Sequence, residues 1–303
     1  MAAVTSASAR RVRRAAGIIG VASGIGAPDR RCGEGPPRLV SDGLIERLAA
    51  RGADVALQAM LEPHYPALYR ALSDLQARLA REVADVLEAG RFPIVLGGDH
   101  SCAIGTWSGA ASALAEKGPL GLVWIDAHMD SHTRATSSSG RPHGMPLAAL
   151  LGHGEARAIA AQSASTVLEG HLDPRYVCLV GVRSHEPEEA ELLARLGVKV
   201  YGQDEVDARG VALVLAEAVS IARSAAAGYG ISVDLDAVDP GEAPGVGTPV
   251  AGGIGARELV AALGACCRDA GYTALEIVEY NPHRDVDNRT ARLVEDMIVA
   301  TLA

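Results

Sequence analysis

Acidic and imidazole side chains alternate in the segment VWIDAHMDSHT, which spans residues 123–133. Asp126, His128, Asp130 and His132 follow one another at every second position, and alternate residues of an extended chain share one face, about 7 Å apart. The apolar residues before them predict a buried strand that ends where these side chains begin. The segment therefore predicts up to four metal ligands on one face, at the end of a strand.

Two further motifs contain the same residue types. Asp234 and Asp236 repeat the alternate spacing in SVDLDAVDP (232–240), and His100 follows two glycines and an aspartate in GGDHS (97–101). Carboxylates mixed with imidazoles suit a hard or borderline divalent ion such as Mn²⁺, whereas a structural Zn²⁺ site favours cysteine. The candidate metal ligands are therefore His100, Asp126, His128, Asp130, Asp234 and Asp236.

This ligand set is larger than one ion needs if some of the carboxylates bridge. We expect two ions about 3.5–4 Å apart, which share a water molecule and lower its pKa toward neutrality. Asp99 and Asp239 lie next to the motifs and are candidates for hydrogen bonds that orient the ligands.

Apolar runs and helical patterns alternate along the chain. Continuous apolar runs, typical of strands covered on both faces of a parallel sheet, occur at 16–21, 92–98, 120–127, 176–182, 229–237 and 273–281, with a weaker run at 198–201. Helical periodicity occurs at 67–90, 102–116, 187–196, 208–226, 256–270 and 288–302. This order predicts a single three-layer α/β domain over residues 15–303, with a mostly parallel, doubly wound sheet, after a flexible tail at 1–14.

The polar motifs all follow predicted strands. Ligands of open α/β sheets bind at the carboxyl ends of the strands, so side chains from several strands can meet at one edge. GGDHS, DAHMD (126–130), DLDAVDP and VEYNP (278–282) each follow a different strand. We therefore expect one site to which four strands contribute.

The composition excludes several classes of protein. The 303 residues are 49% hydrophobic and carry a net charge of −9, which leaves no basic footprint for nucleic acid. No apolar run approaches the roughly 18 residues of a membrane span. Arginines at 10–14 before an apolar run resemble a short secretory signal, but the first strand is the preferred interpretation. Five cysteines without a CxxC pattern indicate reduced thiols in a cytoplasmic protein.

The motifs GGDHS, DAHMD and SVDLDAVDP, in this order, resemble the ureohydrolase family, which contains arginase and agmatinase. The resemblance covers nearly the whole chain from residue 16 and is strongest to bacterial-type arginases. It implies a C–N hydrolase acting on linear amidines: an α/β domain with two Mn²⁺ per chain that hydrolyses a guanidino group to urea. It also implies a homotrimer or homohexamer.

The same resemblance implies how the two ions are held. His100, Asp126, Asp130 and Asp234 would bind the first, and His128, Asp126, Asp234 and Asp236 the second, so that Asp126 and Asp234 bridge. A hydroxide between the metals would attack the guanidinium carbon.

Catalytic roles follow from the resemblance for His143, Glu279 and Asp130. Glu279 in VEYNP would bind the guanidinium, since a planar cation with paired N–H groups matches a carboxylate. Thr248 would lie beside that cation. His143, in SSGRPHGMPL (138–147), would shuttle protons, a task that suits an imidazole.

The serine-rich segment 136–154 favours arginase over agmatinase. Ser139 would bind the α-carboxylate of L-arginine. The chain departs from the arginase pattern at His132 and Arg141, where asparagines are common, and at Ser184 and Glu186, which stand where a pair of aspartates reads the α-amino group, with His185 between them. Arg141 and Glu186 keep a partner for each charged group of an amino acid, so L-arginine, cleaved to urea and L-ornithine, is the predicted substrate.

Three alternatives remain open. Agmatine or another guanidino compound would be cleaved by the same chemistry. A metal-dependent deacetylase would use a single Zn²⁺ and paired histidines, which this chain lacks. A non-catalytic relative would be expected to have lost ligands, and all six are present.

Other polar and aromatic residues are expected to have structural roles. His64, His153, His171 and His283 are predicted to lie on the surface, and Trp107 and Trp124 to pack inside.

Overall fold

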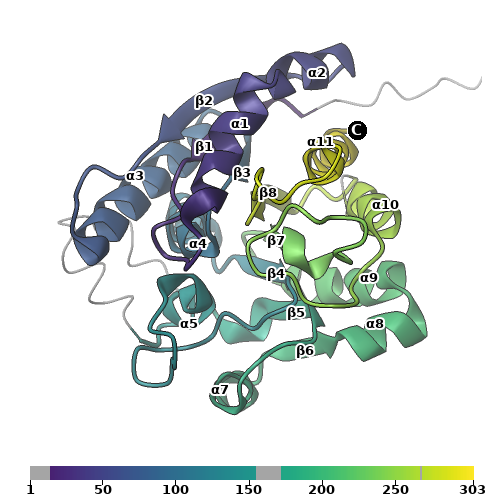
Figure 1. Cartoon of the computed structure of the whole chain (residues 1–303). Coiled ribbons are helices and arrows are strands. Elements are labelled where there is room, and N and C mark those ends of the chain that lie inside the picture. Colours follow the sequence, from purple (N-terminus) through teal and green to yellow (C-terminus); the bar gives the residue numbers. More distant parts are fainter. Residues whose placement is uncertain (1–13, 155–171, 267) are drawn as a thin grey trace, which may run out of the picture.

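The computed structural model describes residues 14–154, 172–266 and 268–303, and its centre is one sheet of eight strands (Figure 1). The strand order is β2-β1-β3-β8-β7-β4-β5-β6, and every neighbouring pair is parallel. The strands are β1 (Ala16–Val21), β2 (Val55–Leu61), β3 (Phe92–Leu96), β4 (Gly121–Ile125), β5 (Val177–Val182), β6 (Lys199–Gly202), β7 (Tyr229–Asp234) and β8 (Tyr272–Val278).

Helices cover both faces of the sheet, which confirms the predicted three-layer α/β architecture (Figure 1). One buried cluster lies under α1 (Gly35–Ser41), α2 (Leu44–Ala50), α8 (Gln203–Arg209), α9 (Val211–Ala222), α10 (Ala256–Cys266) and α11 (Arg289–Leu302). The other lies under α3 (Leu68–Glu88), α4 (Ala103–Ala113), α5 (Pro146–Leu150) and α7 (Pro187–Leu196). Most strands are buried along their whole length, which explains their continuous apolar sequences.

The seven predicted strands are all present, and β2 is the one that sequence patterning missed. β2 is an edge strand with three exposed residues in succession, and Gln58 interrupts its run of apolar residues. The helix predicted at 208–226 is two helices, because Gly210 adopts a positive φ of 83° between them. The short helices α1, α2 and α5 were also not predicted.

The chain reverses its direction of winding inside the sheet. β1, β2 and β3 build one side and β4, β5 and β6 the other, and the last two strands fill the gap between β3 and β4. The four strands that end in polar motifs are therefore consecutive neighbours, in the order β3-β8-β7-β4. Such a switch point is where an α/β sheet opens a crevice for a ligand.

The start of the described chain is anchored to the fold. Arg14 donates from Nη1 to the carbonyl of Tyr272 (2.6 Å), so this residue is not part of a free tail. The rest of the expected tail (1–13), together with His171 and Cys267, lies outside the described residues. Cys32, Cys102 and Cys178 are buried free thiols, and Cys266 is buried as well.

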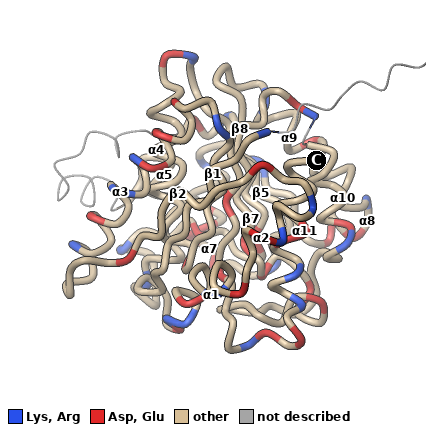
Figure 2. The backbone as a smooth tube through the Cα atoms, turned by 90° about the horizontal axis from the view of Figure 1, so that it is seen from above, with Lys and Arg blue, Asp and Glu red and all other residues tan. Residues whose placement is uncertain are grey.

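Charged residues of both signs are interspersed over the outer helices and turns (Figure 2). None of the described helices combines the length and the apolar composition that crossing a membrane requires.

Candidate active site

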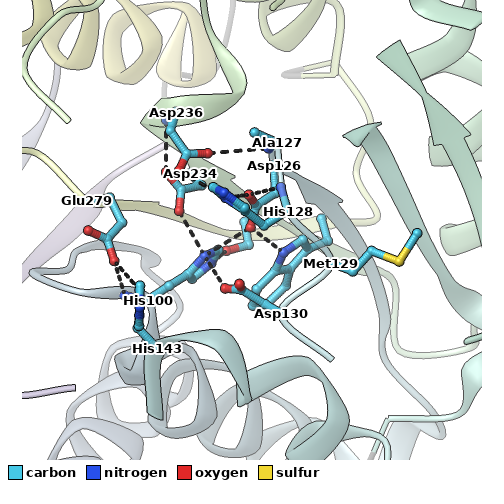
Figure 3. Close-up of polar contacts among 12 residues, drawn as sticks. His100, Asp126, Ala127, His128, Met129, Asp130, His143, Asp234, Asp236 and Glu279 are labelled. Carbon is cyan, nitrogen blue, oxygen red and sulfur yellow. Dashed lines mark hydrogen bonds and ion pairs between the residues drawn. The ribbon is translucent and has the colours of Figure 1, made fainter. Parts of the chain in front are cut away.

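Four metal-ligand candidates meet around the imidazole of His100 (Figure 3). Its Nδ1 atom lies 3.3 Å from Asp126 Oδ2, 3.1 Å from Asp130 Oδ2 and 3.2 Å from Asp234 Oδ2. All four residues are at least nine-tenths buried. They come from the ends of β3, β4 and β7, as the motif positions predict, and they are the four residues expected to hold the first ion.

A second group forms around His128. Its Nδ1 atom lies 3.4 Å from Asp126 Oδ1 and 3.2 Å from Asp236 Oδ2. Asp126 therefore directs one carboxylate oxygen to each imidazole, which is the arrangement of a bridging ligand. Asp234 directs Oδ2 to the first group, while its Oδ1 accepts a hydrogen bond from the backbone N–H of Asp236 (2.8 Å).

The buried face below His100 holds the ligands in place. Trp124 stacks on the His100 ring with centroids 4.0 Å apart, and its Nε1 donates to Asp126 Oδ2 (2.9 Å). His100 Nε2 lies 3.0 Å from Ser232 Oγ. Trp124 thus packs in the strand, as predicted, and also orients two ligands, which was not predicted.

Buried charges at this site shift one another's pKa values. Burial alone would raise the pKa of Asp126, but His100 and His128 outweigh it and lower that pKa. Burial and the charge of Asp126 raise the pKa of Asp130 to about 7. Burial would lower the pKa of His128, yet Asp236 and Asp126 raise it to about 12. The four carboxylates thus lie close enough to repel one another strongly.

Divalent cations fit this ligand set. His100 Nδ1 is buried without a hydrogen-bond partner although it faces three carboxylate oxygens. A lone pair aimed at anions needs a cation between them, and an imidazole with several carboxylates is a ligand set for ions such as Mn²⁺. The His100 and His128 groups are separate clusters that share Asp126, so two neighbouring ions can be held.

Glu279 lies next to the metal-ligand cluster, at the end of β8 (Figure 3). Its Oε1 accepts a hydrogen bond from the backbone N–H of His100 (3.1 Å) and lies 3.5 Å from His143 Nδ1. Its Oε2 is buried and has no partner. Burial would raise the pKa of Glu279, but His143 outweighs it and lowers that pKa. An anionic oxygen is therefore left free for a ligand.

Backbone strain coincides with two of the predicted catalytic residues. Asp130 and Glu279 adopt positive φ values of 46° and 66°. Such conformations cost of the order of 1–3 kcal/mol in residues other than glycine and persist where the surroundings impose them. The Glu279 backbone N–H donates to the carbonyl of Gly98 (2.8 Å), and a Cβ atom at Gly98 would lie 2.0 Å from the carbonyl oxygen of Ser23. The glycines of GGDHS thus permit the close packing that positions Glu279.

Two residues that depart from the arginase pattern, His132 and Glu186, meet in the structure. His132 Nε2 contacts Glu186 Oε2 directly and lies 3.5 Å from Glu189 Oε2. Glu189 is buried and was not predicted as a site residue; it caps α7 and accepts from the backbone N–H groups of Ser131 and Glu186. The end of the pocket away from the metal ligands therefore contains two carboxylates and an imidazole.

A cavity of about 220 Å³ joins the metal ligands to this end of the pocket. Its lining includes most of the predicted site: His128, Asp130, His132, Ser139, His143, Glu186, Asp234, Asp236, Thr248 and Glu279. Arg141 is exposed and does not line it. A larger cavity of about 940 Å³, between α9 and α10, contains none of the predicted site residues.

Sequence inspection missed several residues that support the site. Glu189 lines the cavity together with Ser184 and His185, which the sequence had already placed beside Glu186. Ser232 and Glu276 are fully buried polar residues in otherwise apolar strands, a signal that the sequence does contain. Asp99 caps the turn that carries His100 by accepting from the backbone N–H of Ser101 (3.0 Å). Asp239 caps a turn at Gly241 and forms no hydrogen bond with the ligands, so its expected orienting role is wrong.

Known proteins resemble this chain in sequence and in fold. The family model described as "Arginase family" matches residues 14–303. The chain is 38% identical over 288 residues to an arginase of Bacillus caldovelox, covering 90% of this chain and 93% of that one. It is 37% identical over 297 residues to an arginase of Bacillus subtilis (strain 168), covering 94% and 96%. A crystal structure of arginase from Bacillus subtilis superposes with a TM-score of 0.85 at 35% identity, covering 96% of this chain and 99% of that one.

These matches identify the class and the family of the protein. The protein is an enzyme of the ureohydrolase type. The chain belongs to the arginase family.

Proposed function

We propose that the protein hydrolyses L-arginine to urea and L-ornithine, with two Mn²⁺ held by His100, Asp126, His128, Asp130, Asp234 and Asp236. One observation carries the proposal: Glu279 lines the same small cavity as the ligand cluster, and its buried Oε2 has no hydrogen-bond partner. A guanidinium group is a planar cation whose N–H groups match such a carboxylate. The relatives named arginase at 37–38% identity support the choice of substrate.

Glu279 would bind and orient the guanidinium. Its Oε1 is fixed by the backbone of His100, so the carboxylate lies at a set distance from the ligand cluster and leaves Oε2 to the substrate. Thr248 lines the cavity and supplies a hydroxyl beside the cation. The two metal ions, when bound, would supply Lewis acidity and lower the pKa of a shared water molecule.

His143 would supply a proton to the leaving amine. Burial would lower its pKa, but Glu279 raises the pKa to about 9, so the imidazole carries a proton at neutral pH. The His143 side chain is 21% exposed, which gives it contact with solvent as well as with the cavity. A positioned acid of this kind accelerates C–N cleavage because an unprotonated amide-like nitrogen is a poor leaving group.

Recognition of an amino acid would take place at the His132 end of the cavity. The carboxylates of Glu186 and Glu189 would pair with an α-ammonium group. Ser139 and the imidazole of His132 would donate hydrogen bonds to an α-carboxylate. Agmatine has no carboxylate and would leave these hydrogen-bonding groups without a partner. Sites built around a polar group of the substrate reject analogues that lack it by up to about 10⁴-fold.

We further propose Mn²⁺ as the ion, a cytoplasmic location and assembly into a homotrimer or homohexamer. Neither ligand group contains a thiolate, and oxygen-rich sets favour Mn²⁺ over structural Zn²⁺. The location and the assembly rest on the resemblance to arginases. Sedimentation of the purified protein tests the assembly, and a monomer would contradict it.

Steady-state hydrolysis tests the proposal. The metal-free protein, loaded with Mn²⁺, is assayed for urea with L-arginine, agmatine and 4-guanidinobutyrate. We expect two Mn²⁺ per chain by elemental analysis, kcat/KM highest for arginine, and no urea after chelation or in His128→Ala. A tenfold preference for agmatine would contradict arginine recognition, and urea release without metal would contradict the mechanism.

A further inference from the structure

A row of polar and aromatic side chains crosses the sheet beneath His100. Glu276 of β8 is paired in register with Ser232 of β7, and Ser232 is paired with Trp124 of β4. These three residues are completely buried. Trp124 stacks on His100 and Ser232 contacts its Nε2 atom, whereas Glu276 contacts Ser232.

Glu276 is surrounded by uncharged donors. Its Oε1 accepts from Thr106 Oγ1 (2.5 Å), and its Oε2 accepts from Trp107 Nε1 (2.9 Å) and Ser232 Oγ (2.7 Å). Thr106 and Trp107 belong to α4, so Trp107 does more than the packing that the sequence predicts. A buried carboxylate with these partners is costly unless every hydrogen bond is made, and such groups are retained where they fix a neighbour's geometry.

The direction of these hydrogen bonds fixes which nitrogen of His100 carries a proton. The indole of Trp107 can only donate, so Oε2 acts as an acceptor. The single hydroxyl proton of Ser232 then goes to Oε2, and Ser232 Oγ is left to accept. His100 therefore donates from Nε2, and in a neutral imidazole this leaves the Nδ1 lone pair to face Asp126, Asp130 and Asp234.

We propose that Glu276 is a positioning residue for the metal site: through Ser232 it holds His100 in the tautomer whose Nδ1 can bind a metal ion. Without an acceptor at Glu276, the Ser232 hydroxyl can turn and donate to His100 Nε2. The imidazole proton would then move to Nδ1, where it blocks coordination. The inference rests on the proposed metal-binding function of His100, and it concerns metal uptake rather than the choice of substrate.

Glu276→Met removes the acceptor while keeping the length of the side chain. Outer hydrogen-bond partners of metal-bound histidines typically contribute 10–100-fold to metal affinity. We expect the Mn²⁺ affinity of the site that contains His100 to fall by at least tenfold. The affinity of the site that contains His128 should be unchanged. Titration with Mn²⁺ followed by electron paramagnetic resonance distinguishes them: the wild type gives the signal of a coupled pair, the variant that of isolated Mn²⁺.

Two control variants separate this role from packing and from charge. In Glu276→Gln, the amide oxygen can replace Oε2 toward Trp107 and Ser232 while the NH₂ group donates to Thr106 Oγ1, so both Mn²⁺ steps should stay within about threefold of wild type. Trp107→Phe removes a donor to the same oxygen but leaves the Ser232 bond, and it should also keep both steps. Thermal unfolding of the metal-free variants reports whether each one folds.

Each possible result of the Mn²⁺ titrations either supports or overturns the proposal. Selective loss of one step in Glu276→Met, with both steps kept in Glu276→Gln, supports the proposal. Equal loss of both steps, no loss, or a loss in Glu276→Gln as large as in Glu276→Met overturns it. If Glu276→Met does not fold, Ser232→Ala removes the same acceptor for His100 and must show the same selective loss. A wild type that takes up two Mn²⁺ but releases no urea from arginine would contradict the proposed function and leave this inference standing.

Discussion

Glu279 combines three features that rarely occur together in one residue. It has a positive φ, its carboxylate is buried, and one of its oxygens has no partner. Each feature costs free energy, so the surroundings must impose them. The Glu279 backbone N–H donates to the carbonyl of Gly98, and the His100 backbone N–H donates to Glu279 Oε1. These two hydrogen bonds hold Oε2 ready for a cationic ligand.

Gly247 makes room for this oxygen, which gives a sharp prediction. A Cβ atom at Gly247 would lie 2.5 Å from Glu279 Oε2, closer than van der Waals contact permits. We expect Gly247→Ala to displace the carboxylate and to lower kcat/KM for arginine by at least tenfold, mainly through KM, because a misplaced binding group costs affinity. Mn²⁺ binding should be unchanged, since Glu279 is not a proposed ligand.

Gly144 offers a matched control, because it lines the same cavity and a Cβ atom there would meet nothing within 4 Å. Gly144→Ala should keep kcat/KM within about threefold of wild type, as substitutions without a steric conflict usually have small effects. Equal activities of the two variants would show that Glu279 does not need this space.

His143 gives a prediction about pH. Glu279 raises the pKa of His143 to about 9, so the imidazole is protonated below that pH and neutral above it. If the proton serves the leaving amine, kcat/KM falls as the pH rises through about 9. His143→Asn cannot donate this proton; we expect kcat to be lower by about 10²-fold and the decline near pH 9 to disappear. Initial rates between pH 7 and 10.5 test this, and an unchanged decline in the variant would assign it to another group.

The six candidate ligands could be predicted from sequence because their spacing is local. The extended geometry expected from this spacing is not observed, because Asp130 has a positive φ of 46° and Asp236 lies in the 3-10 turn Leu235–Ala237. The contacts of Ser232, Glu276 and Trp124 could not be predicted, because they depend on the register between strands far apart in the sequence. The contact between His132 and Glu186 was missed for the same reason: it joins the loop after β4 to the start of α7.

At the scale of elements, the order of the strands decides which loops meet. Apolar periodicity predicts that a segment is a strand but contains no information about its neighbours. β7 and β8 lie between β3 and β4, which brings four polar loops to one place. From the general rule for α/β sheets, the sequence predicted that the four polar motifs meet at one edge of the sheet. The observed strand order explains why these four loops, rather than others, are adjacent.

Arg183 joins the loop after β5 to the loop after β7. It follows β5, and its guanidinium donates to the carbonyls of Asp236 (2.7 Å), Val250 (3.1 Å) and Ala237 (3.2 Å). A planar fork of donors makes these bonds at once, which the ammonium of lysine cannot do. We expect Arg183→Lys to lower the free energy of unfolding by about 1–3 kcal/mol, because buried carbonyls lose their partners. Binding of the ion held by Asp236 and His128 should weaken as well.

Chemical denaturation of the metal-free protein and Mn²⁺ titration measure the two effects. Arg175→Lys is a suitable comparison, since the Arg175 side chain is 74% exposed and pairs with Asp173 two residues away. Its unfolding free energy should stay within about 0.5 kcal/mol of wild type. If Arg183→Lys is equally harmless, the loops do not depend on this guanidinium.

At the scale of the molecule, helices from near the two ends of the described chain cover the same face of the sheet. α2 follows β1 near the start of the described chain, and α11 is its last helix, yet both cover the same buried cluster. Glu295 of α11 joins them: it accepts from Arg47 Nε (2.7 Å) and from Arg51 Nη1 (3.1 Å) of the segment at the end of α2. The Glu295 side chain is only 11% exposed, so this contact is partly shielded from solvent.

Stability should therefore depend on the charge of Glu295. Burial would raise its pKa, but Arg47 and Arg51 outweigh burial and lower it below its usual value. A carboxyl group whose pKa is lowered by folding stabilises the protein at pH values above the pKa of the unfolded chain, about 4.3, and this contribution is lost as the pH falls through the folded value. Glu295→Gln removes the charge and should lower the unfolding free energy by about 1 kcal/mol at pH 7, between the values of exposed and buried ion pairs.

The difference in unfolding free energy between wild type and Glu295→Gln should be constant from pH 7 to about 5.5. It should shrink as the pH falls below about 4, because protonation of Glu295 then makes the two side chains alike. Urea denaturation of the metal-free proteins across this range measures it. Asp296→Asn is the control: Asp296 also accepts from Arg51 but is 49% exposed, so screening by water should make its effect smaller. A difference that persists unchanged at pH 3 would mean that the shape of the Glu295 side chain, rather than its charge, joins α11 to α2.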